Sequence, residues 1–170
     1  MAEWKKIRPE DWSGNIFSSL NEDWMLITAA DKAGKANTMT ASWGCFGILW
    51  NKPVGVCFIR PQRYTLPFVE EAERFTMTFL RDGFREALTF CGTKSGRDRD
   101  KIAEAGLHPV TFDGAVTFEE AKTVLIGRKL YVDCLKPEGF LDPSIPKAHY
   151  SRRDFHKIFV AEIEKVLIRA

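Results

Sequence analysis

Long apolar runs are missing from this sequence of 170 residues, and the longest, residues 54–59, has only the length of a strand. We therefore expect no membrane span. The first residues, MAEWKKIRPEDW, lack the apolar core of a secretory signal, so we expect no export. The formal net charge is only +2 and the basic residues are dispersed, which argues against nucleic acid as a partner.

Cysteine is also scarce. The four cysteines are Cys45, Cys57, Cys91 and Cys134. None belongs to a C-x-x-C pair, which leaves a zinc knuckle or a dithiol redox motif unsupported. We interpret them as reduced, mostly buried thiols, which favours a cytoplasmic location. The histidines, His108, His149 and His156, lack the spacing of metal ligands and are interpreted as surface or structural residues, so we predict no metal.

Apolar residues are plentiful, at 45% of the chain, and include thirteen Phe and five Trp. This content and length predict one domain, residues 1–170, around one hydrophobic core. So many aromatic side chains indicate either dense packing or a planar ligand, and packing is the better first interpretation.

Patterning along the chain predicts many strands and few helices. Strands are predicted at residues 25–30, 36–43, 54–59, 75–79, 116–118, 123–132 and 157–168. Short helices are predicted at residues 65–72, 84–90 and 97–105, with Thr65 and Asp82 as N-caps and Gly106 as a stop. This pattern favours a mainly β barrel, and without a G-x-G-x-x-G motif between a strand and a helix a Rossmann fold is unsupported.

Residues 37–44, NTMTASWG, form the first segment that could carry chemistry. Small and hydroxyl side chains leave the backbone N–H and C=O groups accessible, and a flavin ring needs such a row of donors and acceptors. Trp43 could form an apolar wall beside the ring. The alternative is a strand whose hydroxyls face solvent while Trp43 lies in the core, and composition alone favours that alternative.

Residues 60–65, RPQRYT, form the second segment. Arg60 and Arg63 offer forked donors that match phosphate oxygens, and Thr65 would cap the helix that follows. A phosphate site is one interpretation. Two surface arginines beside an ordinary helix cap are the other, and the residues favour neither.

Residues 91–98, CGTKSGRD, form the third segment and superficially resemble a P-loop. Thr93 stands where a P-loop has Gly and no strand leads into the segment, so we reject nucleoside triphosphate binding. A loop bounded by Gly can still approach an anion or a flavin edge through its backbone. A connector between helices, with Ser95 as a cap, is the better interpretation of this segment alone.

Taken together, the segments resemble the flavin reductase-like, FMN-binding split-barrel family, and within it the flavoredoxin-like branch. The resemblance rests on NTMTASWGCFGILWNKPVGVCFIRPQRYT (residues 37–65), CGTKSGRDRDKIAEAGL (91–107) and RKLYVDCLKPEGFLDP (128–143). It covers most of the chain in the expected order. It implies a six-stranded Greek-key split barrel, usually a homodimer, with FMN bound near the subunit interface.

The resemblance also implies the residues of the site. The ring and ribityl chain would lie along Met39, Thr40, Ala41, Ser42 and Trp43, with Asn37 and Thr38 as edge contacts. The phosphate would lie among Arg60, Gln62, Arg63, Tyr64 and Thr65, and the following loop would close the site with Cys91, Lys94 and Ser95. Cys45 stands where relatives often have Gly, which makes that position less open here.

The activity that the resemblance implies is an FMN-dependent oxidoreductase that passes electrons from NAD(P)H or a redox protein through the flavin to an acceptor. We expect no essential protein acid or base, because the flavin carries the chemistry. The alternative is a non-enzymatic FMN-binding electron carrier or sensor. A pyridoxamine-phosphate oxidase-like enzyme shares the topology, but no substrate-specific motif supports it.

Overall fold

Antiparallel strands are the main regular elements of the computed structural model, which describes residues 3–169. The strands are β1 (Trp4–Ile7), β2 (Met25–Ala30), β3 (Ala36–Ala41), β4 (Gly44–Leu49), β5 (Lys52–Ile59), β6 (Arg74–Leu80), β7 (Pro109–Phe112), β8 (Ala115–Phe118), β9 (Ala121–Cys134) and β10 (Lys157–Arg169). The helices are α1 (Ile16–Ser18), α2 (Thr65–Glu71), α3 (Arg85–Thr93), α4 (Lys101–Glu104) and α5 (Ser144–His149), with single turns η1 (Pro9–Asp11), η2 (Ser19–Asp23) and η3 (Pro137–Gly139). The prediction of a mainly β chain with short helices is confirmed.

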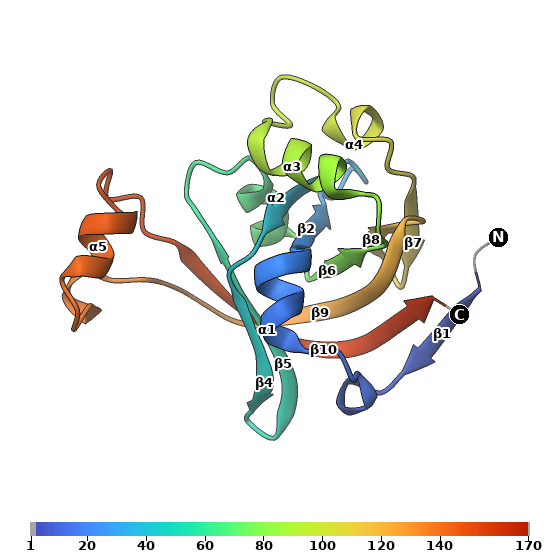
Figure 1. Ribbon diagram of the computed structural model, residues 1–170, viewed down its shortest axis with the longest axis horizontal. Helices are drawn as coiled ribbons and strands as arrows, with labels where there is room; N and C mark the ends of the chain where they lie inside the picture. The colour runs from blue at the N-terminus through green and yellow to red at the C-terminus, as the bar shows by residue number, and fades with distance from the viewer. Residues whose placement is uncertain (1–2, 170) are drawn as a thin grey trace.

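Eight strands form one curved sheet in the order β3-β2-β6-β9-β10-β5-β4, with β1 added against β10 (Figure 1). β7 and β8 form a separate hairpin. β5 and β6 follow one another in sequence, but β9 and β10 lie between them in the sheet. The connection through α2 therefore joins two strands that are not neighbours in the sheet. β3 and β4 are the two ends of this strand order, and the barrel is therefore split between them.

The number of strands differs from the six that the resemblance implies, because β1 and β4 join the sheet. β1 is short and two of its four residues are exposed lysines, and β4 shows little burial along its length. Both are held by pairing, β1 with β10 and β4 with β5. Local patterning does not encode such pairing, because strand formation depends on tertiary neighbours.

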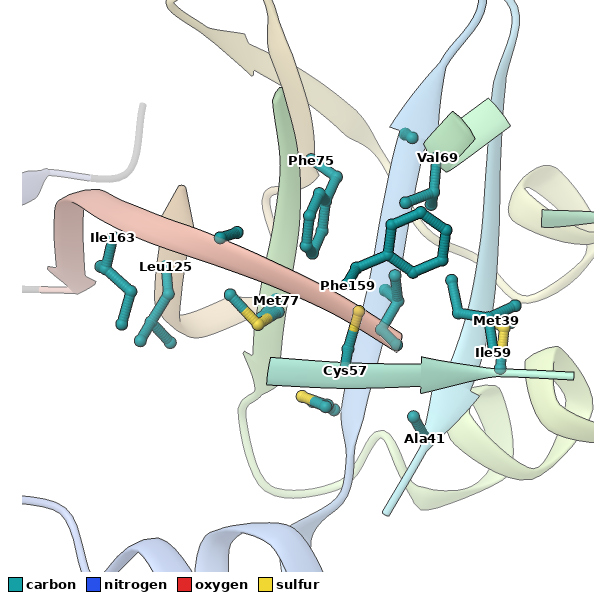
Figure 2. Packing of buried hydrophobic residues seen from close by; sticks show 14 of the residues in the cluster. Met39, Ala41, Cys57, Ile59, Val69, Phe75, Met77, Leu125, Phe159 and Ile163 are labelled. Carbon is teal, nitrogen blue, oxygen red and sulfur yellow. The ribbon is translucent and has the colours of Figure 1, made fainter. Parts of the chain in front are cut away.

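The core lies inside the barrel, where β6 contributes Phe75 and Met77 beside Phe159 of β10 and Cys57 of β5 (Figure 2). All four side chains are fully buried. The opposite face of β6 carries hydroxyls that β8 covers, since Thr76 Oγ1 donates to the backbone carbonyl of Val116 at 2.7 Å. Apolar residues and threonines alternate strictly along β6, so one face of the strand packs into the apolar interior and the other forms hydrogen bonds to β8. This alternation fixes the register of β6.

The helix starts differ from the predictions. Thr65 is the first residue of α2 rather than its N-cap, and its Oγ1 accepts a hydrogen bond from Asn37 Nδ2 at 2.8 Å. Phe84, not Asp82, precedes α3. α4 begins only at Lys101, because the side chain of Asp100 caps it. Gly106 follows α4 with a φ of 67°, as a helix stop requires.

Residues 135–156 leave the barrel between β9 and β10 and carry α5 away from it (Figure 1). The segment returns through an aromatic cluster in which the rings of Tyr150 and Phe155 stack at 4.9 Å. This return brings Asp154 to Arg60 in the loop after β5 and places the ring of His156 beside Phe58 of β5. Within residues 3–169, no helix has the length and apolar character that a membrane span requires.

Candidate functional site

The candidate site lies at the split of the barrel, where the ends of β3 and β5 approach each other. A cavity of about 190 Å³, which we name the strand cavity, opens there. It is lined by Met39, Thr40, Ala41, Ser42, Trp43, Phe58, Arg60, Arg63 and His156. The first and second segments of the sequence analysis therefore meet in one hollow.

A second cavity of about 250 Å³, the loop cavity, adjoins the first. It is lined by Arg60, Gln62, Arg63, Tyr64, Thr65, Thr93, Lys94, Ser95, Arg97 and Lys101. Arg60 and Arg63 line both cavities, so the two adjoin at these side chains. The loop cavity thus joins the second and third segments, with five cationic side chains and no carboxylate in its lining.

A third cavity of about 250 Å³, the α3 cavity, lies between α3 and the end of β3. Its lining consists of Trp24, Thr40, Ser42, Leu88, Thr89, Gly92 and Thr93. Thr40 and Ser42 also line the strand cavity, and Thr40 Oγ1 donates to the carbonyl of Leu88 at 2.5 Å. This bond holds α3 against the end of β3.

Arg60 is fixed by acceptors from the returning segment. Its Nη1 lies 2.6 Å from Asp154 Oδ2, and its Nη2 donates to the carbonyl of His149 at 2.9 Å. Gln62 Nε2 donates to the same Asp154 oxygen at 2.8 Å. The hydrogen bonds from Gln62 and Arg60 lower the pKa of Asp154, so this carboxylate stays ionised at neutral pH.

Arg63 has a different environment. Its Nη1 donates to the carbonyl of Gly92 at 2.6 Å, and within residues 3–169 no carboxylate forms an ion pair with it. Burial, followed by the charge of Arg60, lowers the pKa of the Arg63 guanidinium. Arg63 is therefore a partly desolvated cation without a carboxylate partner among the residues that the structure describes.

Lys101 is a cation that the sequence analysis missed. Its residue is only 4% exposed, and its Nζ donates to the carbonyls of Cys91 at 3.1 Å and Lys94 at 3.2 Å. Within the described chain it has no carboxylate partner, and burial lowers its pKa to about 8. No sequence signal marks this lysine, because its burial arises only when α3 and α4 pack together.

His156 was interpreted as a surface or structural residue, and it is a buried residue that also lines the strand cavity. It is 7% exposed, its Nδ1 lies 2.7 Å from the Tyr150 hydroxyl, and its ring lies 5.3 Å from that of Trp43. Burial, reinforced by Arg60, lowers the pKa of His156 to about 4. The imidazole is therefore neutral at pH 7.

Three expected site residues lie outside these cavities. The side chain of Thr38 is in the core, 2.7 Å from Thr28 Oγ1. Asn37 is buried against Thr65, and Cys91 is fully buried, where desolvation raises its pKa to about 11. Cys91 contributes its carbonyl to Lys101 rather than a reactive thiol to the site.

The remaining expectations concern Trp43, Ser95 and the start of α2. Trp43 is 45% exposed, so it is not a core residue. Ser95 Oγ accepts from the backbone N–H of Arg97 at 3.2 Å and so shapes a turn rather than capping a helix. The start of α2 offers few free donors, because the N–H of Leu66 bonds to the carbonyl of Arg63 and Pro67 has none.

Chemically, the arrangement combines an anion site with a partly apolar slot. Arginine and lysine donors in the loop cavity suit phosphate oxygens. In the strand cavity, Trp43 and Phe58 provide apolar surface. Among the described strands β3 pairs with β2 alone, so backbone groups on its other edge have no sheet partner there. Over residues 3–169, no cluster of His, Cys, Asp or Glu could hold a metal ion.

Comparison with known proteins gives one family and one fold. The model of the family described as "Flavin reductase like domain" matches residues 17–170. No curated protein matches the sequence. Among solved structures, an FMN-binding domain of a flavin reductases-like enzyme from Shewanella baltica is similar, with a TM-score of 0.69 and 15% identity over 98% of this chain and 78% of that chain.

Two further solved structures are similar to this chain. Flavoredoxin of Desulfovibrio vulgaris has a TM-score of 0.66 and 20% identity, over 85% of this chain and 68% of that chain. A protein with a split barrel domain from Shewanella frigidimarina has a TM-score of 0.67 and 17% identity, over 85% of this chain and 65% of that chain. Identities this low show the fold, and they confirm the predicted split barrel.

Proposed function

The chain belongs to the flavin reductase-like family, as the sequence resemblance predicted, and we propose that it binds FMN non-covalently and acts as an oxidoreductase. One observation carries the proposal. Arg60 and Arg63 line the strand cavity and the loop cavity together, so one ligand can place a phosphate in the second and a planar ring in the first. FMN has both parts.

The donor set of the loop cavity fits a phosphate. Arg63 is half-buried and Lys101 is buried, and both donate to backbone carbonyls without a carboxylate partner within residues 3–169, so a bound dianion would supply the missing countercharge. Arg97 lines the same cavity and stays in place by packing on Tyr64, 5.0 Å from the ring centroid. Lys94, Ser95 and Thr93 would close the cavity from the α3 end.

The strand cavity and the α3 cavity fit the ring. We propose that residues 39–43 line it, with the backbone of edge strand β3 offering donors and acceptors to its polar end. Trp43 and Phe58 would exclude water from part of its surface. Positive charge from Arg60 and Arg63 beside the ring would stabilise negative charge that develops on reduction.

FMN supplies the hydride and electron chemistry when bound. We propose that electrons come from NAD(P)H or a redox protein and leave to an acceptor. No protein acid or base is assigned to the chemistry. Tyr150 and Trp43 position His156, whose neutral imidazole would pack beside the ring.

We further propose a homodimer. Exposed apolar side chains gather where the β4–β5 turn meets β9, and the rings of Trp50 and Tyr131 lie 6.4 Å apart there. Ile48, near the end of β4 that leads into this turn, is 66% exposed. Such a patch suits an interface with a second copy of the chain. Cytoplasmic location and a single domain over residues 1–170 stay predictions of the sequence.

The purified protein tests the proposal through its absorbance spectrum, an FMN titration and anaerobic mixing with NADH or NADPH. We expect a flavin spectrum or saturable FMN binding, followed by bleaching of the flavin band at a catalytic rate. Failure to bind FMN would contradict the proposal. Binding without bleaching by either nucleotide would remove NAD(P)H as donor and favour a redox-protein donor, a carrier or a sensor.

A further inference from the structure

The α3 cavity extends beyond the end of β3 that the flavin ring is proposed to contact. It shares only Thr40 and Ser42 with the strand cavity, and the rest of its lining comes from α3 and from Trp24, the residue before β2. No contact to FMN is proposed above for Trp24, Leu88 or Thr89. The volume of about 250 Å³ lies just below that of drug-sized sites, roughly 300–1,000 Å³, and suits a small ring compound.

Trp24 has a backbone conformation that bulky residues rarely adopt. Its φ is 65°, in the left-handed region that favours glycine. Its backbone N–H donates to the carbonyl of Ser19 at 2.9 Å, and its indole Nε1 donates to the carbonyl of Asn21 at 3.2 Å. The guanidinium of Arg85 lies 4.2 Å from the ring centroid and donates to the carbonyl of Glu22. Strained residues that several contacts hold in place cluster at ligand sites, which indicates a binding role for this indole.

The other wall of the cavity is set by the packing of α3 on β3. At Gly92, a Cβ atom would lie 3.3 Å from Thr40 Cβ, so glycine permits the close approach of the helix to the strand end. Thr40 Oγ1 donates to the carbonyl of Leu88 and fixes the helix in this position. The cavity is therefore formed before a ligand binds, as most small-molecule sites are.

The lining favours an uncharged, flat ligand. None of the described residues that line the cavity has an ionisable side chain, so a charged ligand would find no countercharge there. Trp24 and Leu88 offer apolar surface, and an indole packs well against another flat ring. The same lining argues against a nicotinamide dinucleotide, whose phosphates would need cations.

The hydroxyl groups of the lining are not equivalent. Thr40, Thr89 and Thr93 already donate to backbone carbonyls, two of them within α3 itself. Ser42 makes no side-chain hydrogen bond within residues 3–169, so its hydroxyl is the one that can donate to a carbonyl group of a ligand. Because Ser42 also lines the strand cavity, that ligand would lie beside the proposed flavin ring.

We propose that the α3 cavity binds the electron acceptor of this protein, a small uncharged quinone, with its ring against Trp24 and one carbonyl at the Ser42 hydroxyl. The inference rests on the proposed flavin function and names a substrate class for it. A quinone becomes a hydroquinone when it takes up an electron pair, here from the donor by way of the flavin, and one proton on each oxygen. Solvent supplies the protons, since Thr89 and Thr93 are exposed residues of the lining.

Equilibrium dialysis of duroquinone against the oxidised, FMN-loaded protein tests the inference. This probe is uncharged and planar, and its fully methylated ring has no free position to which a cysteine could add. We expect saturable binding. Thr89→Trp fills the cavity from an exposed position of α3 and should weaken duroquinone binding roughly tenfold or more. Thr111→Trp is the matched control, because Thr111 is an exposed threonine of β7 outside this cavity, and it should leave binding unchanged.

A second variant removes the indole. Trp24→Gly suits the positive φ and should lower duroquinone affinity roughly twofold to tenfold, with folding checked by thermal melting. FMN affinity, titrated separately, should stay near that of the wild type in both variants. If Trp24→Gly does not fold, Thr89→Trp alone decides.

Four outcomes contradict the inference. Absence of duroquinone binding to a protein that holds FMN overturns it and leaves FMN binding intact, as does an affinity that Thr89→Trp does not change. Joint loss of FMN and duroquinone binding in Thr89→Trp assigns the cavity to the flavin ring. Displacement of duroquinone by NADH assigns it to the donor. If the wild type binds no FMN, the proposed function itself has failed and the acceptor role fails with it.

Discussion

Arg60 and Asp154 form an ion pair across the candidate site, with Arg60 Nη1 2.6 Å from Asp154 Oδ2. The pair joins the loop after β5 to the segment that returns from α5, residues far apart in sequence. It also distinguishes the two arginines of the site, because Arg60 has a carboxylate partner, whereas Arg63 donates to the carbonyl of Gly92 and has no carboxylate partner in the described part of the chain. A bound phosphate should consequently interact more favourably with Arg63 than with Arg60.

Substitution of the two arginines should therefore have unequal effects. Arg63→Ala should weaken FMN binding by roughly tenfold to a hundredfold, because charged phosphate hydrogen bonds contribute roughly 1.5–3 kcal/mol. Arg60→Ala should cost less affinity, since Asp154 already compensates that charge. Fluorescence titration measures both, with the exposed Arg152→Ala as control. Equal affinity of the wild type and Arg63→Ala would show that the phosphate lies elsewhere.

FMN affinity should depend on pH through Lys101. Its pKa is about 8 in the free protein, and an anion nearby would raise that value. The protonated form binds the anion better, so affinity should be level below pH 8 and fall as pH rises above it, by up to roughly tenfold per pH unit. Titrations between pH 7 and 9.5 measure the slope.

Two variants separate Lys101 from other titrating groups. Lys101→Arg keeps the charge over this range and should flatten the slope while retaining affinity. Lys101→Met should lower affinity at pH 7 and also flatten the slope. An unchanged slope in a folded Lys101→Arg protein, with folding checked by thermal melting, would assign the pH dependence to another group.

Protein stability should fall in mild acid because of His156. The folded pKa is about 4 and the ordinary value is 6.5, so between these values the unfolded chain binds a proton that the folded chain does not. The contribution to stability is therefore complete above pH 6.5 and is lost as pH falls toward 4, by at most roughly 1.4 kcal/mol per pH unit. Urea unfolding of the wild type and of His156→Asn at several pH values isolates this contribution. Parallel pH profiles of the unfolding free energy in the two proteins would contradict it.

Gly96→Ala should destabilise the fold and the site together. The new Cβ would lie 2.1 Å from Asn37 Oδ1, so the loop or Asn37 must shift, which typically costs roughly 1–3 kcal/mol. The shift would also move Arg97 and lower FMN affinity. Gly139→Ala is the control, because no atom lies within 4 Å of its added Cβ, and it should stay within about 0.5 kcal/mol of wild type. Thermal melting and flavin titration test both variants.

Strands with strong alternation were predictable, as β6 shows. Phe75, Met77 and Phe79 face the core and the intervening threonines face β8, so residue types alone set the two faces. β4 was not predictable, because most of its residues are exposed and it exists through pairing with β5. Thr65 was misassigned as a cap, since its hydroxyl has a tertiary partner, Asn37, that no local rule supplies.

The sequence by itself determined the mainly β class, the family and the two segments that meet at the strand cavity, because alternation, turn residues and motif order are local properties of the chain. Only the tertiary structure decided that Lys101 is a buried cation, that His156 faces the site and that Asp154 pairs with Arg60. Burial and charge pairing depend on which distant segments meet. The electrostatic character of this site therefore becomes defined only when the barrel and its returning segment are assembled.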